Sequence, residues 1–376
     1  MTLAGRNDLA GIEQPWHTLV QRAANSLPFN QHAFLTAWSE TYPDAEPLIM
    51  LGWDGDQLEA ALPFAIKRSR SLTTLEWMGE PFTEYGDALI APGLTSMELL
   101  KLFEDGSSEA MGITGGYDLL VLRKVRADSA IAPVLTVLGA RPSDTRMAPF
   151  VPLGNVKDRD SLLAQFGANL RKELRRKRRK IEAAGEYCFA VHRGGMPARR
   201  ALDAAMAFKS QWLEKRGLTS RAFLDGNAGE FLDRLVPDTP AQDVTKDGIL
   251  LSEITLDGRT LAVEIGFRNA GRYFAFLGSY DEDMAEWGAG TLQLADTMQW
   301  CAENGISEFD LFAPADSYKL RWTQEGVAIA DYTQAHTAIG HAMLAYRRNL
   351  RPLLKSVYER MPPSMRRSLK LIAENI

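Results

Sequence analysis

Short apolar runs separated by polar turns divide the first 150 residues into strands and helices. Pro47–Trp53 and Leu58–Ile66 are predicted strands, and the Asp54-Gly55-Asp56 turn between them predicts a β-hairpin. The same patterning predicts strands at Leu72–Met78, Asp87–Ile90 and Tyr117–Leu122, and helices at 30–40, Met97–Glu104 and Ala130–Gly139. Residues 1–30 carry few periodic signals. This mixture of elements predicts an α/β or α+β half.

Pro149–Asn155 is the predicted boundary to a second half. From Asp158 to Ala184, apolar residues recur at a spacing near 3.6, which predicts one long helix or two in series. Its opposite face carries LRKELRRKRRK, with eight bases between Arg171 and Lys180. The remaining elements are predicted in this order: strand Glu186–Arg193, helices Pro197–Arg216 and Gly229–Val236, a hairpin of Ile249–Leu256 and Thr260–Asn269, strand Val327–Thr333, and a helical region Ala335–Ile376.

The stretch from Arg272 to Trp322 carries the clearest chemical signal. It predicts a strand at Arg272–Tyr280, a glycine turn at Gly288-Ala289-Gly290, a helix to Asn304 and a strand at Ile306–Phe312. A glycine turn that opens a helix after a strand leaves backbone N–H groups free at the positive end of the helix dipole. We therefore predict an anion site there, most simply for a phosphate or pyrophosphate.

Composition narrows the class of protein. The length of 376 residues is typical of about two domains, and the net charge of −5 means that a polyanion would need a local basic patch. The two cysteines form no disulfide framework, and the five histidines (His17, His32, His192, His336, His341) show no zinc-type spacing, so no metal is predicted. We see no signal-peptide pattern and no apolar run of about 18 residues, so a cytoplasmic protein is expected.

The second half resembles the GNAT acetyltransferase superfamily, whose acyl-CoA site is a strand, a Gly-x-Gly loop opening a helix, a second strand and a loop carrying a tyrosine. Here the loop is Gly288-Ala289-Gly290 and the tyrosine is Tyr318. The CelD-type acetyltransferases of exopolysaccharide biosynthesis, related to the FemABX transferases, are the branch that the chain resembles. This rests on LRKELRRKRRKIEAAGE, on FDLF…DSYKLRW, and on a tandem layout with PFNQHAFLTAW and EYGD in the first half. It covers residues 28–335, most specifically 165–322.

The resemblance implies tandem GNAT-like domains, each a twisted mixed sheet flanked by helices, with a C-terminal helical tail. The implied ranges are 1–155, 156–335 with the acyl-CoA site, and 336–376 for the tail. Acetyl-CoA is the implied acyl donor, held by Ser279, Tyr280, Gly288, Ala289, Gly290 and Thr291. GNAT enzymes usually carry Gln or Arg three residues before the first glycine, where this chain has Ala285; this indicates a weaker hold on the pyrophosphate or a different acyl donor. FemABX relatives use aminoacyl-tRNA.

Catalysis needs an acid and a base. The resemblance assigns the acid to Tyr318, because a phenol near the sulfur can protonate a leaving thiolate; a packed ring with its hydroxyl in water is the alternative. The base candidates are, in order, Glu264, Asp281 and Asp310. Glu264 stands inside the apolar segment LAVEIGF, so it needs a partner or a raised pKa. A solvent-facing strand residue is the alternative for each carboxylate.

Six residues are candidates for acceptor binding: Arg171, Arg175, Lys319, Arg321, Tyr85 and Asp87. The basic helix predicts an anionic acceptor such as a nucleotide sugar or a lipid-diphosphate sugar, or contact with the CoA 3′-phosphate. A solvated charged face is the alternative. Nucleic acid is a third interpretation, which the negative net charge and the absence of interleaved aromatics disfavour except for tRNA in a FemABX-like transferase. Tyr85 and Asp87 are candidates for a cleft between the halves, with a strand-end turn as the alternative.

Three functions are compatible with these residues. The first is an acetyl-CoA-dependent N-acetyltransferase acting on an amino sugar or sugar-linked precursor of a surface polysaccharide, as in biofilm formation. The second is a FemABX-like transferase using aminoacyl-tRNA, and the third a degenerate GNAT fold that responds to a nucleotide such as cyclic di-GMP. The basic, amphipathic tail after Tyr346 is a candidate for that nucleotide or for an anionic inner-membrane surface, with packing on its own domain as the default.

Overall fold

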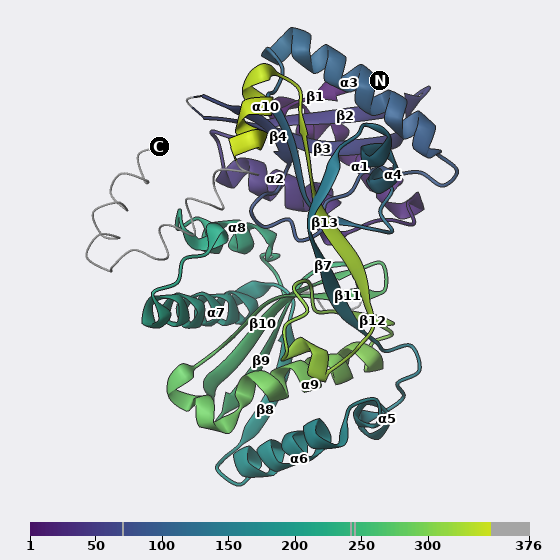
Figure 1. Ribbon diagram of the computed structural model, residues 1–376. Coiled ribbons are helices and arrows are strands. Elements are labelled where there is room, and N and C mark those ends of the chain that lie inside the picture. Colours follow the sequence, from purple (N-terminus) through teal and green to yellow (C-terminus); the bar gives the residue numbers. More distant parts are fainter. Residues whose placement is uncertain (70, 241–242, 244–245, 347–376) are drawn as a thin grey trace, which may run out of the picture.

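The computed structural model describes residues 1–69, 71–240, 243 and 246–346 (Figure 1). The strands are Thr2–Ala4 (β1), Glu46–Asp54 (β2), Gln57–Arg68 (β3), Thr73–Trp77 (β4), Leu89–Ile90 (β5), Leu119–Arg126 (β6), Arg141–Pro152 (β7), Tyr187–His192 (β8), Gly248–Leu256 (β9), Arg259–Asn269 (β10), Arg272–Tyr280 (β11), Glu308–Asp310 (β12) and Gly326–Ala335 (β13). The α-helices are Leu9–Arg22 (α1), His32–Thr41 (α2), Ser96–Thr114 (α3), Ile131–Val137 (α4), Arg159–Ala164 (α5), Ala168–Glu182 (α6), Gly195–Arg216 (α7), Ala228–Leu235 (α8), Ala289–Glu303 (α9) and Ala338–Ala345 (α10).

All of these strands belong to one continuous mixed sheet. Its order is β1-β2-β3-β4-β6-β13-β7-β12-β11-β10-β9-β8, with β5 paired to β3 beside this path. Helices cover both faces (Figure 1). The predicted α/β fold with a mixed sheet flanked by helices is therefore confirmed. Among the described helices, none is long and apolar enough to cross a membrane.

Alternation along the strands sends apolar side chains to both faces of the sheet, and each face has its own core. In the N-terminal half, α1 and α2 pack against one face and α3 and α4 against the other. In the C-terminal half, α7 and α8 cover one face, whereas α5, α6 and α9 cover the opposite one. The core under α1 and α2 continues without a break into the core under α7 and α8. The two halves therefore share one hydrophobic core.

Two strands join the halves. β13 follows the second half in sequence, yet it lies between β6 and β7 and pairs antiparallel with both. β7 pairs with β13 up to Pro149 and then with β12 through Phe150–Pro152. Residues 326–335, predicted as part of the second domain, thus extend the sheet of the first (Figure 1). The domain ranges themselves stay a prediction.

Several local predictions were wrong, for identifiable reasons. Residues 1–30 contain α1, whose buried stripe is short because Pro15 and polar residues interrupt it. The predicted boundary Pro149–Asn155 instead ends β7, which has three prolines and an exposed first half. The strand predicted at Ile306–Phe312 shrinks to β12, because the Asp310 carboxylate accepts the Phe312 N–H and Phe312 has a φ of +56°. By contrast, the prediction of one long helix or two in series over residues 158–184 is confirmed, since α5 and α6 follow each other there and the basic segment lies in α6. The tail predictions at 347–376 lie outside the described residues.

Candidate active site

A cavity of about 550 Å³ opens where two neighbouring strands of the C-terminal half separate. β11 and β12 run parallel and pair at only three positions, ending at Phe274 and Asp310. Beyond that point β11 stays paired with β10, with a bulge between Ala275 and Leu277. The cavity lies in the space between the diverging strands, with walls from β10, β11, α7, α9 and the loop that carries Tyr318.

One end of the cavity is the N-terminus of α9. The residues predicted to hold the acyl donor all line this cavity: Ser279, Tyr280, Gly288, Ala289, Gly290 and Thr291. Gly288 precedes α9 with a φ of +67°, a left-handed conformation that favours glycine. A Cβ at Gly288 would lie 2.5 Å from the Lys177 side chain, and one at Gly290 would lie 3.2 Å from the Tyr280 ring. A side chain at position 288 would displace the end of the Lys177 side chain, and one at position 290 would press on the Tyr280 ring. Glycine at both positions keeps the backbone at this helix N-terminus open to a phosphate.

Lys177 adds a positive charge at this end of the cavity. Its Nζ donates a hydrogen bond to Thr291 Oγ1 at 3.0 Å and lies 2.7 Å from Glu173. Arg321 also lines the cavity and pairs with Glu173. Lys177 was not among the predicted site residues, although it stands at the spacing of the buried stripe formed by Leu174 and Ile181.

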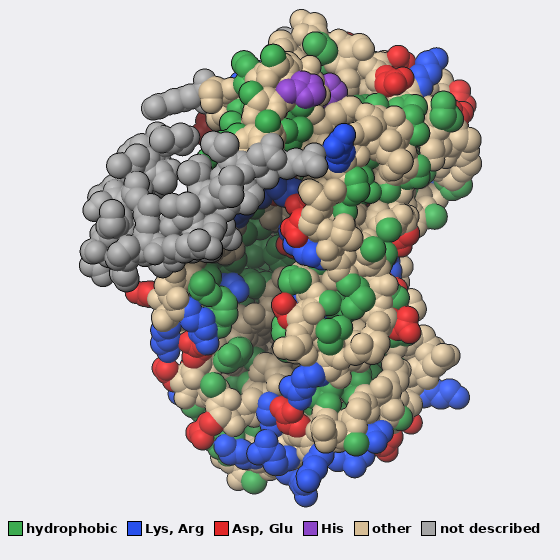
Figure 2. Space-filling model, in the orientation of Figure 1, with side chains coloured by type: hydrophobic (Ala, Val, Ile, Leu, Met, Phe, Trp, Pro, Cys, Tyr) green, Lys and Arg blue, Asp and Glu red, His purple; other side chains and the backbone are tan. Residues whose placement is uncertain are grey.

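Arg171 and Arg175 lie elsewhere. Arg175 is exposed and lines a separate surface hollow with Arg159 and Arg178, while Arg171 lines neither hollow nor cavity. Residues two positions apart on a helix point about 200° apart, so Arg175 and Lys177 face different sides. The basic side chains gather at the end of the molecule where α6 lies (Figure 2).

Glu264 lies on β10 within the cavity wall, opposite Gly278 of β11. Its side chain is 2% exposed, and its Oε1 has no hydrogen-bond partner among the described residues. Burial raises the pKa of Glu264 to about 8, opposed only in part by the Tyr273 hydroxyl. A buried carboxylate without a cationic partner costs free energy, and such groups gather at functional sites.

A second polar group faces the same space from α9. Gln293 lines the cavity and donates to Ser252 Oγ at 2.6 Å, while its Oε1 has no partner among the described residues. Gln293 was not among the predicted site residues. The wall around Glu264 therefore has an unused acceptor on each of two elements.

Tyr318 lies in the loop between β12 and the 3-10 helix Lys319–Arg321, and it lines the cavity. The residue is 50% exposed. Partial burial, followed by the charges of Glu264 and Asp316, raises the pKa of Tyr318 to about 12. The hydroxyl is therefore protonated at neutral pH, and it is close enough to Glu264 for the carboxylate charge to act on it.

Asp281 and Lys319 do not line the cavity. The Asp281 carboxylate accepts the N–H of Asp283 at the start of the 3-10 helix Glu282–Trp287 and pairs with Arg259. Lys319 is buried, and its Nζ donates to the carbonyl of Phe312 at 2.9 Å. Both contacts stabilise local turns, which explains why polar residues occupy these positions.

Tyr85, Asp87 and Asp310 are buried away from the cavity lining. The Tyr85 hydroxyl donates to Asp310 Oδ1 at 2.7 Å, and Arg126 Nη1 lies 3.3 Å from Oδ2. Asp87 accepts N–H groups from Ala88 and from the start of α4, together with the Asn25 amide. These side chains hold the halves and their turns in place, and the predicted cleft contacts are absent from the described cavity lining.

The other wall of the cavity comes from α7, through Phe208, Lys209 and Trp212. Lys209 Nζ lies 4.4 Å from the centre of the Trp212 ring, and no described residue forms an ion pair or hydrogen bond with it. Burial lowers the pKa of Lys209. This wall was not predicted from the sequence, because a lysine on an amphipathic helix has no distinguishing pattern.

One known protein family matches a segment of the second half. Residues 168–320 match the family described as an acetyltransferase (GNAT) domain. The match contains the cavity's strands, α6 and the α9 N-terminus. No curated protein matches the chain.

Solved structures share the whole fold. FemX has a TM-score of 0.61 at 12% identity, covering 89% of this chain and 97% of its own. L-PGS from Bacillus licheniformis has a TM-score of 0.57 at 12% identity, covering 89% and 95%. A tandem GNAT protein from the clavulanic acid biosynthesis pathway has a TM-score of 0.50 at 12% identity, covering 89% and 98%. At this identity the likeness concerns the fold.

The chain is therefore an enzyme of the acyltransferase class with a tandem GNAT fold. Its residues 168–320 match the GNAT acetyltransferase domain, and its fold is shared with FemX.

Proposed function

We propose that this enzyme transfers an acyl group from acyl-CoA, most simply acetyl-CoA, to an amine of an anionic acceptor. The acceptor class proposed is an amino sugar or sugar-linked precursor of a surface polysaccharide, as in the CelD-type branch. The observation that carries the proposal is the buried Glu264, whose Oε1 has no hydrogen-bond partner among the described residues. It lies in the cavity whose other end is the glycine turn Gly288-Ala289-Gly290 before α9, called the cradle from here on.

The cradle fits a pyrophosphate. The free N–H groups of the first turn of α9 donate to it, and Lys177 and Arg321 supply positive charge beside them. Lys177 compensates for the missing polar side chain at Ala285, because it reaches the same helix N-terminus from α6. Acyl-CoA, when bound, supplies a thioester carbonyl as the electrophile.

Two side chains move the protons. As the acceptor nitrogen forms its bond to the carbonyl carbon, Glu264 accepts the proton that the nitrogen loses. As the carbon–sulfur bond breaks, Tyr318 donates its hydroxyl proton to the sulfur. The pKa of about 8 makes Glu264 a stronger base than an ordinary carboxylate. The proton balance closes when Glu264 returns its proton to solvent and Tyr318 regains one.

The acceptor lies against α7 in this proposal. Lys209 offers an uncompensated cation there, and Trp212 and Phe208 offer aromatic faces on which a sugar ring can pack. This moves the predicted anion contact from Arg171 and Arg175 to Lys209.

A transferase that uses aminoacyl-tRNA is the second candidate. The exposed basic side chains of α6, including Arg175 and Arg179 around the second hollow, favour it (Figure 2). FemX shares the fold. A tRNA gel shift that weakens steeply with salt, together with no acetyl transfer, would support this candidate.

Calorimetry with CoA and acetyl-CoA tests the donor assignment. We expect binding to the wild type and a weakening of about ten- to 100-fold for Lys177→Met, since a charge-assisted contact contributes roughly 1.5–3 kcal/mol. Lys172→Met, an exposed neighbour on α6, is the matched control and should bind as the wild type does. Absence of binding at millimolar ligand would contradict the proposal.

A further inference from the structure

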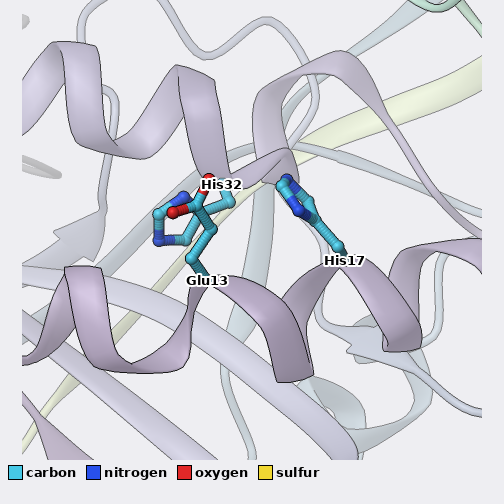
Figure 3. A group of neighbouring side chains, drawn as sticks. All are labelled: Glu13, His17 and His32. Atoms are coloured by element: carbon cyan, nitrogen blue, oxygen red, sulfur yellow. The ribbon is translucent and has the colours of Figure 1, made fainter.

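Three side chains from two helices of the N-terminal half gather far from the acyl-transfer cavity. Glu13 and His17 lie four residues apart on α1, and His32 is the first residue of α2. Among the described residues, this is the one group of three or more His, Cys, Asp or Glu side chains whose candidate ligand atoms all lie within 4.8 Å of one another. Figure 3 shows the Glu13 carboxylate beside the His32 ring, with the His17 ring on the next turn of α1.

The hydrogen bonds of His32 fix its tautomer. Its Nε2 lies 2.8 Å from the carbonyl oxygen of Leu9, which can only accept, so Nε2 carries the proton. Nδ1 is then the ring nitrogen that can offer a lone pair, and the Thr36 hydroxyl lies 3.5 Å from it. A histidine that donates one ring N–H to a backbone carbonyl and offers the other nitrogen is the usual arrangement of a metal ligand.

The other two side chains are uncommitted. Within the described residues, neither Glu13 nor His17 makes a hydrogen bond or an ion pair, and the centroids of the His17 and His32 rings lie 5.9 Å apart. His192 offers a contrast, because it pairs with Glu253 at 3.1 Å. The Glu13–His17–His32 group thus has free donor atoms of the types that transition metals bind.

We propose that Glu13, His17 and His32 bind one divalent transition-metal ion of the zinc class. Two imidazole nitrogens and one carboxylate suit zinc, cobalt or nickel, whereas calcium and magnesium prefer oxygen ligands alone. Water completes the coordination. Ligand atoms around a tetrahedral zinc lie closer than the 4.8 Å limit of this group, and rotation of the exposed Glu13 side chain together with His17 closes the difference.

Such an ion would fasten α1 to α2. α2 directly follows the 3-10 helix Pro28–Asn30, whose Phe29 packs against Phe274 and Phe312 beside the diverging strands. The ion therefore acts as a structural clamp on the shared core. Its binding does not depend on the acyl-transfer proposal, since no cavity residue is a ligand.

The test uses full-length, tag-free protein stripped with a chelator. Calorimetry with zinc chloride should give one ion per chain, cobalt should give visible d–d bands, and zinc should raise the apparent Tm by about 3 °C or more at saturating excess. His17→Gln and Glu13→Gln should each weaken binding at least tenfold and abolish the Tm shift. His341→Gln, at an exposed histidine on α10, should leave both unchanged.

Two results would overturn the proposal: no stoichiometric binding at millimolar zinc, or binding that His17→Gln leaves intact. Loss of binding through misfolding is recognised independently, because the chelated variants should then unfold at a lower temperature than the chelated wild type. Loss of binding in His192→Gln, with His17→Gln unaffected, would assign the ion to the Glu253 pair instead.

Discussion

At the scale of single residues, the protonation of Glu264 governs the proposed reaction. Only the ionised carboxylate can accept a proton, and the pKa is about 8 because the side chain is buried. We expect kcat/KM to rise with pH and to level off above about 8. Glu264→Gln should lower kcat by about 100-fold or more and remove this limb of the profile. A profile that is flat between pH 6 and 9 would contradict the assignment of Glu264 as base.

The same burial predicts an effect on stability. The folded-state pKa of Glu264 lies above its unfolded value, so the folded protein binds the extra proton, and stability falls as pH rises from about 4.5 to 8. Glu264→Gln removes this penalty. It should stabilise the protein by on the order of 3 kcal/mol at pH 7 and by little at pH 4. Denaturant unfolding at the two pH values measures the difference, and equal effects at both would show that the carboxylate has a partner in solution.

Lys209 tests the acceptor side. Lys209→Gln removes the cation but keeps a polar side chain only one atom shorter, so the KM for an anionic acceptor should rise about tenfold while the KM for acyl-CoA stays constant. Lys215→Gln is the control, because Lys215 lies on the same helix and already pairs with Asp283. Steady-state kinetics with paired amino sugars, one phosphorylated and one neutral, measure the effect. An equal loss for both sugars would mean that Lys209 does not recognise the anion.

At the scale of elements, the glycine turn after α9 provides a control for the glycine turn before it. Both glycines have a left-handed backbone conformation, which strains an alanine. In Gly288→Ala the new Cβ would also clash with the Lys177 side chain, whereas in Gly305→Ala no atom lies within 4 Å of the new Cβ. Both should cost about 1 kcal/mol of stability from the backbone. Only Gly288→Ala should also weaken CoA binding, by about tenfold, as measured by calorimetry. Equal CoA affinity of the two variants would show that the glycine turn before α9 does not contact CoA.

The sequence was informative where an element and its chemistry are local. The β11 strand, the glycine turn and α9 are contiguous, so the residue types alone predicted an anion site at the turn, and the GNAT resemblance added Ser279 and Tyr280, which line the same cavity. The spacing of the buried stripe of α6 could have singled out Lys177, but seven other bases surround it in the sequence and none of the eight is distinguished by residue type. Lys209 and Gln293 could be recognised as site residues only from the cavity that they line. The pairing of β13 with β6 joins segments about 200 residues apart, so local sequence patterns could not predict it.

At the scale of the whole molecule, the shared sheet and core predict that the halves unfold together. β7 and β13 each pair across the junction, and one apolar cluster runs under helices of both halves. Calorimetry of the full chain should therefore show one transition instead of two. Two resolved transitions would mean that the predicted ranges 1–155 and 156–335 are independent folding units.

The buried hydrogen bond from Tyr85 to Asp310 also joins the two halves. Tyr85→Phe leaves the ring among Phe29, Phe274 and Phe312 but removes the donor to the buried Asp310 carboxylate, which should cost about 1–3 kcal/mol. Because that bond joins the N-terminal half to β12, the variant should lower the Tm of the whole molecule. Tyr117→Phe is the control: its hydroxyl contacts Ser107 within the N-terminal half at 3.4 Å, and a smaller loss is expected. Since neither residue lines the cavity, CoA affinity should stay unchanged in both variants; a fall in Tyr85→Phe alone would show that the junction also sets the separation of β11 and β12.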